Sequence, residues 1–141
     1  MYRKILVALE NGSADENLIA HVTELAGRLH SELLLVHVAD GWAARNYNQL
    51  KLAESEEIKV DRAYLKKIEE NIHKAGITVT SQLALGNPPQ EILKVAEAEH
   101  CDLIAMGSHG HRLIGDLIHG SAVHEVRHKT TIPVLTVREK K

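Results

Sequence analysis

Five short runs of hydrophobic residues recur along the chain. Four of them, residues 5–9, 32–38, 102–106 and 133–137, are apolar at successive positions. This pattern is typical of strands that are covered on both faces, as in a parallel sheet. The remaining run, residues 77–85, alternates in part between apolar and polar positions. It therefore predicts a more exposed strand near an edge of the sheet.

Amphipathic helical patterns lie between these runs. In the first, apolar residues from Leu18 to Leu29 are spaced by 4, 3 and 4 positions, which places them on one face of a helix. Just before it, Ser13 and Glu16 have the spacing of a capping box. We therefore expect a helix that begins near Ser13, with reciprocal hydrogen bonds at its start.

Three more helices follow from the same reasoning. Apolar positions from Ile58 to Ile72 predict the second helix, which ends near Gly76. Asn87 and Pro88 are typical of the residue that caps a helix and of its first helical position, so they predict the start of the third. A short fourth helix is expected over residues 121–128.

The resulting order of elements is βαβαβαβαβ, which predicts an α/β fold. Strands that alternate with helices form a parallel sheet with right-handed connections and helices on both faces. No boundary between domains is visible, so we expect one domain over residues 1–141. The longest stretch without a pattern, residues 39–57, predicts a loop that runs into the second helix.

Composition excludes several classes of protein. The formal charge is −2 and 44% of the residues are hydrophobic, so no overall field attracts nucleic acid or an anionic membrane. The single cysteine, Cys101, allows no intrachain disulfide, which suits a reducing compartment. No run reaches the roughly 20 apolar residues of a membrane span, and the N-terminus has no pattern of a signal peptide. A soluble, cytoplasmic protein is expected.

The segment GSHGHRLIGDLIHGS, residues 107–121, is the strongest candidate for a binding site. It holds four glycines, leaves the fourth strand and leads into the fourth helix. Backbone N–H groups at the start of a helix favour an anion, and glycine lets the backbone approach it closely. A glycine-rich surface connection capped by Ser121 is the alternative. The segment is neither a Walker P-loop nor a Rossmann G-x-G-x-x-G turn.

The spacing of the loop is informative in its own right. Gly107, Gly110, Gly120 and Ser121 fit the pattern G-x2-G-x9-G-[S/T], which resembles the ATP-binding motif of the universal stress protein family. The segments KILVALENGS, LLLVHV, LGNPPQEIL, CDLIAMGSHG and HGSAVHEVRHKTTIPVLTVR resemble other parts of that family. The resemblance covers nearly the whole chain.

This resemblance implies a three-layer open sheet of five parallel strands in the order 3-2-1-4-5, like that of the adenine nucleotide alpha hydrolases. It also implies a homodimer formed through the last strand, residues 132–138. The ligand implied is ATP, accompanied by Mg²⁺ or Mn²⁺. In open α/β sheets ligands bind where the strand order reverses, which here is between the first and fourth strands.

The resemblance also implies which residues surround the nucleotide. Contacts to the adenine and its surroundings are implied for Ala8, Leu9, Glu10, Val38 and Met106. Contacts to ribose and phosphates are implied for Gly107, His109, Gly110, Gly120, Ser121 and Ala122.

Two points about this set of nucleotide-binding residues concern this chain in particular. The family usually has Asp after the first strand, and in this chain either Glu10 or Asn11 takes that place. Arg112 and the nearby histidines would supply positive charge beside the phosphates, as a Walker lysine does elsewhere.

Our first hypothesis is an ATP-binding universal stress protein that acts as a nucleotide-dependent regulatory or stress-response factor through its dimer and partner contacts. The first alternative is a slow ATPase or another nucleotide-dependent enzyme, although Asp116 is the only carboxylate within the loop. The second alternative is a dimeric stress protein that binds no nucleotide, against which the intact glycine spacing argues. No catalytic residue is assigned. His124 and His128 have a spacing that can hold a metal, but with no cysteine nearby we expect no metal site there.

Overall fold

The computed structural model describes residues 1–39, 56–108 and 122–140. Its centre is a parallel sheet of five strands, in the order β3-β2-β1-β4-β5. The α/β class, the strand order and the placement of helices on both faces, all predicted above, are confirmed. The strands are β1 (Lys4–Leu9), β2 (Glu32–Ala39), β3 (Val79–Leu85), β4 (Leu103–Ser108) and β5 (Val134–Arg138).

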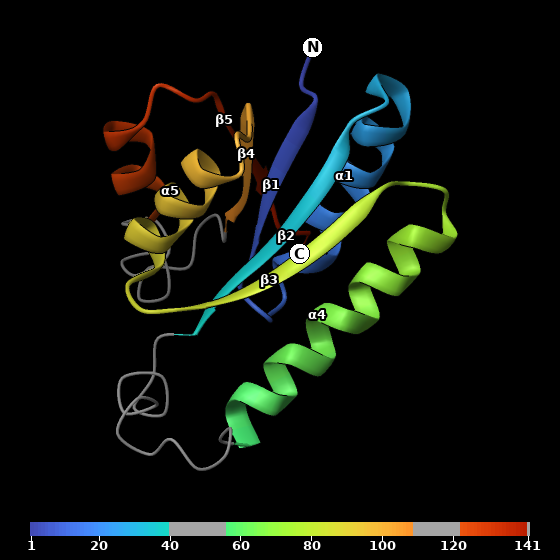
Figure 1. The fold of residues 1–141 in the computed structure, drawn as a ribbon, viewed down its shortest axis with the longest axis horizontal. Coiled ribbons are helices and arrows are strands. Elements are labelled where there is room, and N and C mark those ends of the chain that lie inside the picture. The colour runs from blue at the N-terminus through green and yellow to red at the C-terminus, as the bar shows by residue number, and fades with distance from the viewer. Residues whose placement is uncertain (40–55, 109–121, 141) are drawn as a thin grey trace.

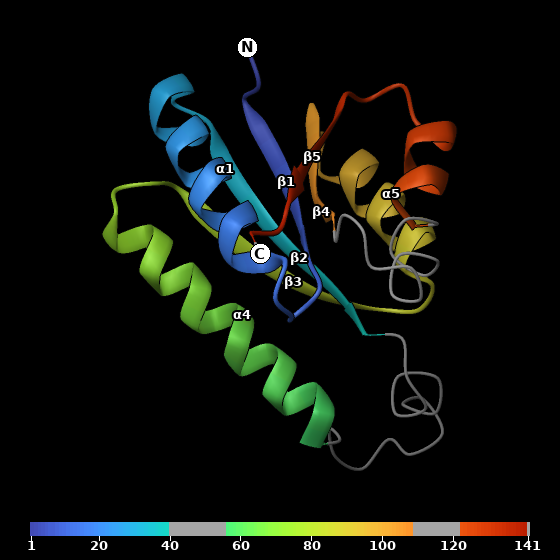
Figure 2. The same ribbon diagram turned by 180° about the vertical axis from the view of Figure 1, so that it is seen from behind.

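Helices cover the sheet in two layers (Figure 1). The labelled helices are α1 (Asp15–Leu29), α4 (Glu56–Lys74) and α5 (Pro88–Ala98), and residues 122–129 are also helical. Helices α1 and α4 lie on one side of the sheet, while α5 and the helix of residues 122–129 lie on the other (Figure 2). Among the residues that the structure describes, no helix is long and apolar enough to cross a membrane.

The alternation of side chains along each strand produces two separate cores. In β1, Ile5, Val7 and Leu9 pack under α1 and α4, whereas Leu6 and Ala8 pack under α5 and the helix of residues 122–129. Because both sets are buried, β1 is apolar at successive positions, as expected for a central parallel strand. The pattern in the sequence therefore has a direct physical cause.

The expected boundaries are correct within two residues for most elements, but the start of α1 differs from the prediction. The helix begins at Asp15, and its N-cap residue, Ala14, makes no side-chain capping bond. The Ser13 hydroxyl donates instead to Glu139 Oε2 at 2.7 Å. The capping box predicted for Ser13 and Glu16 is therefore wrong, because a distant carboxylate takes the serine hydroxyl.

The start of α5 agrees with the prediction. Asn87 has an extended backbone, and its Oδ1 accepts a hydrogen bond from the Gln90 amide at 3.2 Å. Pro88 follows at the first helical position, where its missing N–H costs nothing. This cap sets the position at which α5 begins, beside the carboxyl ends of the strands.

Cys101 is buried just before β4 and has the character of a small apolar side chain. Burial raises the pKa of its thiol to about 11, with a smaller contribution in the same direction from Glu99. A thiol with so high a pKa is almost entirely protonated at neutral pH and is therefore a poor nucleophile.

The two edges of the sheet are β3 and β5. In β5, Leu135 and Val137 face the core beneath α1, and Val134 faces the opposite core. The Glu139 amide donates to Ser108 O at 2.8 Å. In a parallel ladder alternate residues bond to the same neighbour, so the Leu135 and Val137 amides face β4 and the Thr136 amide points away from the sheet.

Candidate functional site

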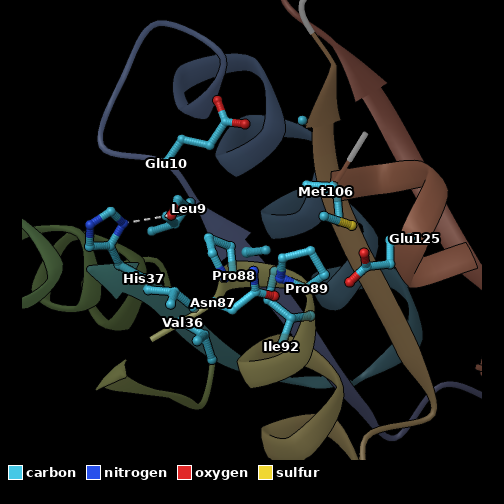
Figure 3. Close-up of a pocket in the computed structure, with 14 residues that line it drawn as sticks. Leu9, Glu10, Val36, His37, Asn87, Pro88, Pro89, Ile92, Met106 and Glu125 are labelled. Atoms are coloured by element: carbon cyan, nitrogen blue, oxygen red, sulfur yellow. Dashed lines mark hydrogen bonds between the residues drawn. The ribbon is translucent and has the colours of Figure 1, made fainter. Parts of the chain in front are cut away.

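A cavity of about 410 Å³ lies at the carboxyl ends of β1, β2 and β4. It is on the side of the sheet that α5 and residues 122–129 cover (Figure 3). The position is the one where the strand order reverses, since β2 and β4 flank β1 on opposite sides. Open α/β sheets bind their ligands at this point. The geometry therefore marks the cavity as the candidate site.

The walls of the cavity are largely apolar. Ala8, Val36 and Met106 contribute from three neighbouring strands, and Ile92 contributes from α5. These side chains share one face of the sheet because they occupy the same parity along their strands. Apolar walls contributed by the sheet and by α5 suit a weakly polar group such as a base.

Polar groups stand at the rim. Figure 3 shows Glu10 above the cavity, with His37 and Glu125 at opposite sides of the view. Glu125 lies on the helix of residues 122–129, where its carboxylate is 3.6 Å from the Lys129 ammonium. Asn87, the cap of α5, completes the polar lining. A ligand in this cavity would thus meet apolar walls and two carboxylates.

The structure brings seven of the predicted site residues together around this cavity. They are Ala8, Leu9, Glu10, Val38, Met106, Gly107 and Ala122. The other five, His109, Gly110, Arg112, Gly120 and Ser121, lie outside the described residues. Glu10 and Asn11 were the two residues predicted for the family's Asp position. Of these two, Glu10 is the one that lines the cavity.

Sequence reasoning did not assign several lining residues to the site. Val36 and Val38 share one parity on β2, so the alternation of that strand would have indicated Val36. Ile92 was not assigned to the site either, although it lies on the inner face of α5. His37 lies between Val36 and Val38 on β2, but the alternation of that strand places its side chain on the other face. No signal in the sequence indicated Glu125, which reaches the cavity only through the packing of a helix that is distant in the chain.

Glu10 is held in place by the carboxylate of Asp15. The Glu10 amide donates to Asp15 Oδ1 at 2.9 Å, and the Asn11 and Gly12 amides donate to Oδ2 at 2.8 and 3.3 Å. Asp15 is 1% exposed. The turn between β1 and α1 is therefore folded around one buried carboxylate.

Tyr64 of α4 adds a fourth donor to this carboxylate. Its hydroxyl donates to Asp15 Oδ2 at 2.8 Å. Burial, followed by the charge of Asp15 and the hydrogen bond to it, raises the pKa of Tyr64 well above its ordinary value. Tyr64 is thus a neutral donor throughout the physiological range, and it ties α4 to the turn that carries Glu10.

A second link joins α4 to the rim of the cavity. His37 Nδ1 lies 2.8 Å from Leu9 O, and its Nε2 lies 3.4 Å from Asp61 Oδ2. Asp61 Oδ1 accepts a hydrogen bond from Asn11 Nδ2 at 2.6 Å. Since a carbonyl oxygen only accepts, His37 Nδ1 must carry a proton. Both ring nitrogens have protein partners, so His37 links the ends of β1 and β2 to α4.

Gly107 has a structural role in addition to lining the cavity. A Cβ at this position would lie 3.0 Å from the Cβ of Ala14, which is closer than ordinary van der Waals contact. Ala14 itself is fully buried. The absence of a side chain at Gly107 lets the start of α1 pack directly against the end of β4.

The fold and the cavity define an α/β protein with a pocket at the switch point of its sheet. The model of the Universal stress protein family matches residues 1–138. Universal stress protein MJ0577 of Methanocaldococcus jannaschii is 32% identical over an alignment of 160 residues, gaps included, which spans 99% of this chain and 97% of that protein. The chain belongs to the universal stress protein family.

Solved structures agree with this assignment. MJ0577 itself superposes with a TM-score of 0.82 at 30% identity, over 100% of this chain and 99% of its own. A universal stress protein from Archaeoglobus fulgidus, solved in complex with dAMP, has a TM-score of 0.71 at 21% identity and covers 96% of this chain and 97% of its own. Another, solved in complex with cAMP, has a TM-score of 0.74 at 16% identity and covers 99% and 98%. At these identities the last two share the fold.

The bond between Tyr64 and Asp15 can be tested by removing one oxygen. We expect Tyr64→Phe to lower the free energy of unfolding by roughly 1.5–3 kcal/mol, the usual contribution of a hydrogen bond to a charged group. Urea unfolding followed by circular dichroism measures this. Tyr2→Phe is the matched control, because the Tyr2 ring packs against the same core. Equal losses in the two variants would contradict a specific role for the Tyr64 hydroxyl.

Proposed function

We propose that this protein binds ATP in the cavity at the carboxyl ends of β1, β2 and β4. It acts as a nucleotide-dependent regulatory or stress-response factor, and it exerts this effect through its dimer and through contacts with partner proteins. Residues 1–141 form one domain in this proposal, and the site of action is the cytoplasm.

The observation that carries the proposal is the composition of the cavity. Residues implied by resemblance from four separate segments of the chain, among them Ala8, Val38, Met106 and Ala122, line one space of about 410 Å³. That volume is within the range of roughly 300–1,000 Å³ that small-molecule sites occupy. The apolar walls suit the adenine.

The phosphates are assigned to the glycine loop. Gly107 and Ala122, the described residues at either end of this loop, both line the cavity, so the loop begins and ends beside the bound base. Backbone amides, Ser121 and the side chains of His109 and Arg112 are the donors in this proposal.

The ligands of two relatives support an adenine nucleotide. The two complexes with dAMP and cAMP described above are universal stress proteins of the same fold. We extend the class of ligand to this chain because its cavity has the lining that a base requires. The choice of ATP rests on the glycine spacing.

A divalent cation would enter with the nucleotide. Within residues 1–39, 56–108 and 122–140, no group of three or more His, Cys, Asp or Glu side chains could hold a metal ion. The described lining contributes two carboxylates, Glu10 and Glu125. Mg²⁺ commonly binds through one or two carboxylates together with substrate phosphates. Mg²⁺ or Mn²⁺ bound to ATP therefore fits this donor set, and the ion would neutralise part of the charge between phosphates and carboxylates.

The first test is ATP affinity measured by calorimetry. Gly110→Val and Gly120→Val should abolish measurable binding, because the added side chain would occupy the space that the phosphates approach. Gly27→Ala is the control, since its methyl group meets only Ile77 at an ordinary 3.7 Å and lies on α1, away from the cavity. If both loop variants remain folded and bind ATP as the wild type does, the loop is not the phosphate site.

The enzyme alternative is separated by assaying phosphate release. Efficient phosphoryl transfer needs a metal clamp, an oriented water molecule and a cation on the transferred group. His37 has both nitrogens engaged, and the loop has one carboxylate, Asp116. We therefore expect turnover with Mg²⁺ or Mn²⁺ below about 1 s⁻¹, the low end of ordinary enzymes. Faster turnover that Asp116→Asn abolishes would establish an ATPase instead.

The dimer is proposed to form through β5, over residues 132–138. This strand is an edge of the sheet, and such an edge presents backbone groups that a second copy can pair with. Thr136 is exposed and its amide faces away from β4. An antiparallel pair of β5 strands across a two-fold axis would use that amide in both copies.

A proline at position 136 tests this pairing without altering the contacts to β4. Thr136→Pro removes one outward N–H per copy, so two hydrogen bonds of about 1 kcal/mol each are lost from the dimer. The dimer should weaken roughly thirtyfold, since 1.4 kcal/mol is a factor of ten. Sedimentation equilibrium measures this, and Thr136→Ala, which keeps the amide, is the control. A wild type that is monomeric at micromolar concentration would exclude the proposal.

A further inference from the structure

The register of the strands divides the cavity into an inner end and a carboxyl edge. Ala8 pairs with Val36 on β2 and with Met106 on β4, so these three side chains form an apolar floor at one level of the sheet. Glu10 and Val38 come later along the chain and lie nearer the carboxyl edge. A base that packs on the floor therefore occupies the inner end.

The two helices on this side of the sheet contribute the walls of the inner end. Both run away from the carboxyl edge, α5 from Pro88 and the other helix from residue 122 (Figure 2). Ile92 and Glu125 line the cavity about one helical turn beyond these starts. Figure 3 shows the Glu125 carboxylate directed from its helix toward the side that Pro89 and Ile92 form. Glu125 thus brings a negative charge to the inner end.

The other polar side chains of the described lining lie elsewhere. Glu10 follows β1 at the carboxyl edge, and the His37 ring is held by β1 and by Asp61. Asn87 caps α5 through its Oδ1. In the part of the chain that the structure describes, Glu125 is therefore the polar side chain that a base on the floor would meet.

The start of α5 borders the cavity, but its first amides are not available to a phosphate. Pro88 and Pro89 have no N–H. The Gln90 amide donates to Asn87 Oδ1 at 3.2 Å, and the Glu91 amide donates to Asn87 O at 3.0 Å. A helix binds phosphate through free amides at its start. This wall therefore suits the base, which agrees with phosphates placed at the glycine loop.

A carboxylate selects among purines by the group on carbon C6, because an ionised carboxylate only accepts hydrogen bonds. Adenine has an amino group there, which donates, whereas hypoxanthine and guanine have a carbonyl oxygen, which accepts. The Lys129 ammonium lies 3.6 Å from the Glu125 carboxylate, and this pair is partly exposed. Such pairs are weak, and a carboxylate has about four sites that accept a hydrogen bond. Glu125 can therefore accept from a ligand as well.

We propose that Glu125 is the specificity-determining residue of the cavity, and that its carboxylate accepts a hydrogen bond from the 6-amino group of the bound purine. This inference rests on the proposed function, since the purine is that of the nucleotide. The divalent cation then lies at the carboxyl edge with Glu10 and the phosphates, because Mg²⁺ commonly binds through a single carboxylate together with phosphates.

The test compares ATP with ITP by calorimetry in the presence of Mg²⁺. The two nucleotides have the same ribose and phosphates, and their bases differ at C6 and in the proton on N1. Affinities are measured for the wild type, for Glu125→Gln and for Glu97→Gln. Glu97→Gln is the matched control, because it removes one carboxylate from an exposed position of α5 that does not line the cavity. Circular dichroism establishes that each protein is folded.

We expect the wild type to bind ATP at least about tenfold more tightly than ITP, which is the discrimination of a hydrogen bond to a charged group. In Glu125→Gln the ratio should fall below about threefold, because a glutamine amide can also donate to the carbonyl oxygen of hypoxanthine. Glu97→Gln should keep the wild-type ratio. A second readout uses the wild type alone: the ¹³C signal of the Glu125 side-chain carboxyl should shift more with ATP than with ITP.

Equal affinities of the wild type for ATP and ITP would overturn this proposal. A preference that Glu125→Gln retains, or that Glu97→Gln also loses, would overturn it as well, and so would a Glu125 carboxyl signal that ATP leaves unchanged. A wild type that binds neither nucleotide would overturn the proposed function and this inference with it. The two failures are distinguishable, because the first is seen only in a protein that binds ATP.

Discussion

The buried carboxylate of Asp15 is the interaction on which the carboxyl edge of this sheet depends. After β1 the chain must reverse its direction within a few residues and enter α1, and the amides of the turn can join neither the strand nor the helix. Asp15 lies in the first turn of α1, and its carboxylate accepts hydrogen bonds from three of these amides. Backbone donors that are buried without partners are rare in proteins because they cost free energy. This side chain therefore determines where Glu10 lies.

A second set of polar contacts connects that turn to α4. Tyr64 donates to Asp15, while Asp61 contacts Asn11 and His37. His37 in turn bonds to the last residue of β1. The rim of the cavity is thus formed by the ends of β1 and β2. Helix α4 contacts these ends from the other side of the sheet. The contacts of Asp61 with Asn11 and His37 therefore tie the position of this rim to the packing of α4.

The fold could be predicted because it follows from patterns that are local in the sequence. Apolar runs specified buried parallel strands, and Asn87 with Pro88 specified the start of α5, since both depend on neighbouring residues. The start of α1 could not be predicted in the same way. Ser13 and Glu16 have the spacing of a capping box, yet Ser13 bonds to Glu139, which is 126 positions away. His37 and Asp61 were missed for the same reason, as only the folded chain brings them within 3.4 Å.

Gly107 shows why a glycine motif is not by itself evidence that a protein binds a ligand. It is the first glycine of the spacing G-x2-G-x9-G-[S/T], and it lines the cavity. Its lack of a side chain is nevertheless required by Ala14, whose Cβ would lie 3.0 Å from an added Cβ. A larger residue at this position would separate α1 from β4 whether or not a nucleotide binds, because close-packed cores absorb extra volume poorly. The first glycine of the motif therefore meets a packing requirement, and it cannot by itself serve as evidence for the proposed binding of a nucleotide.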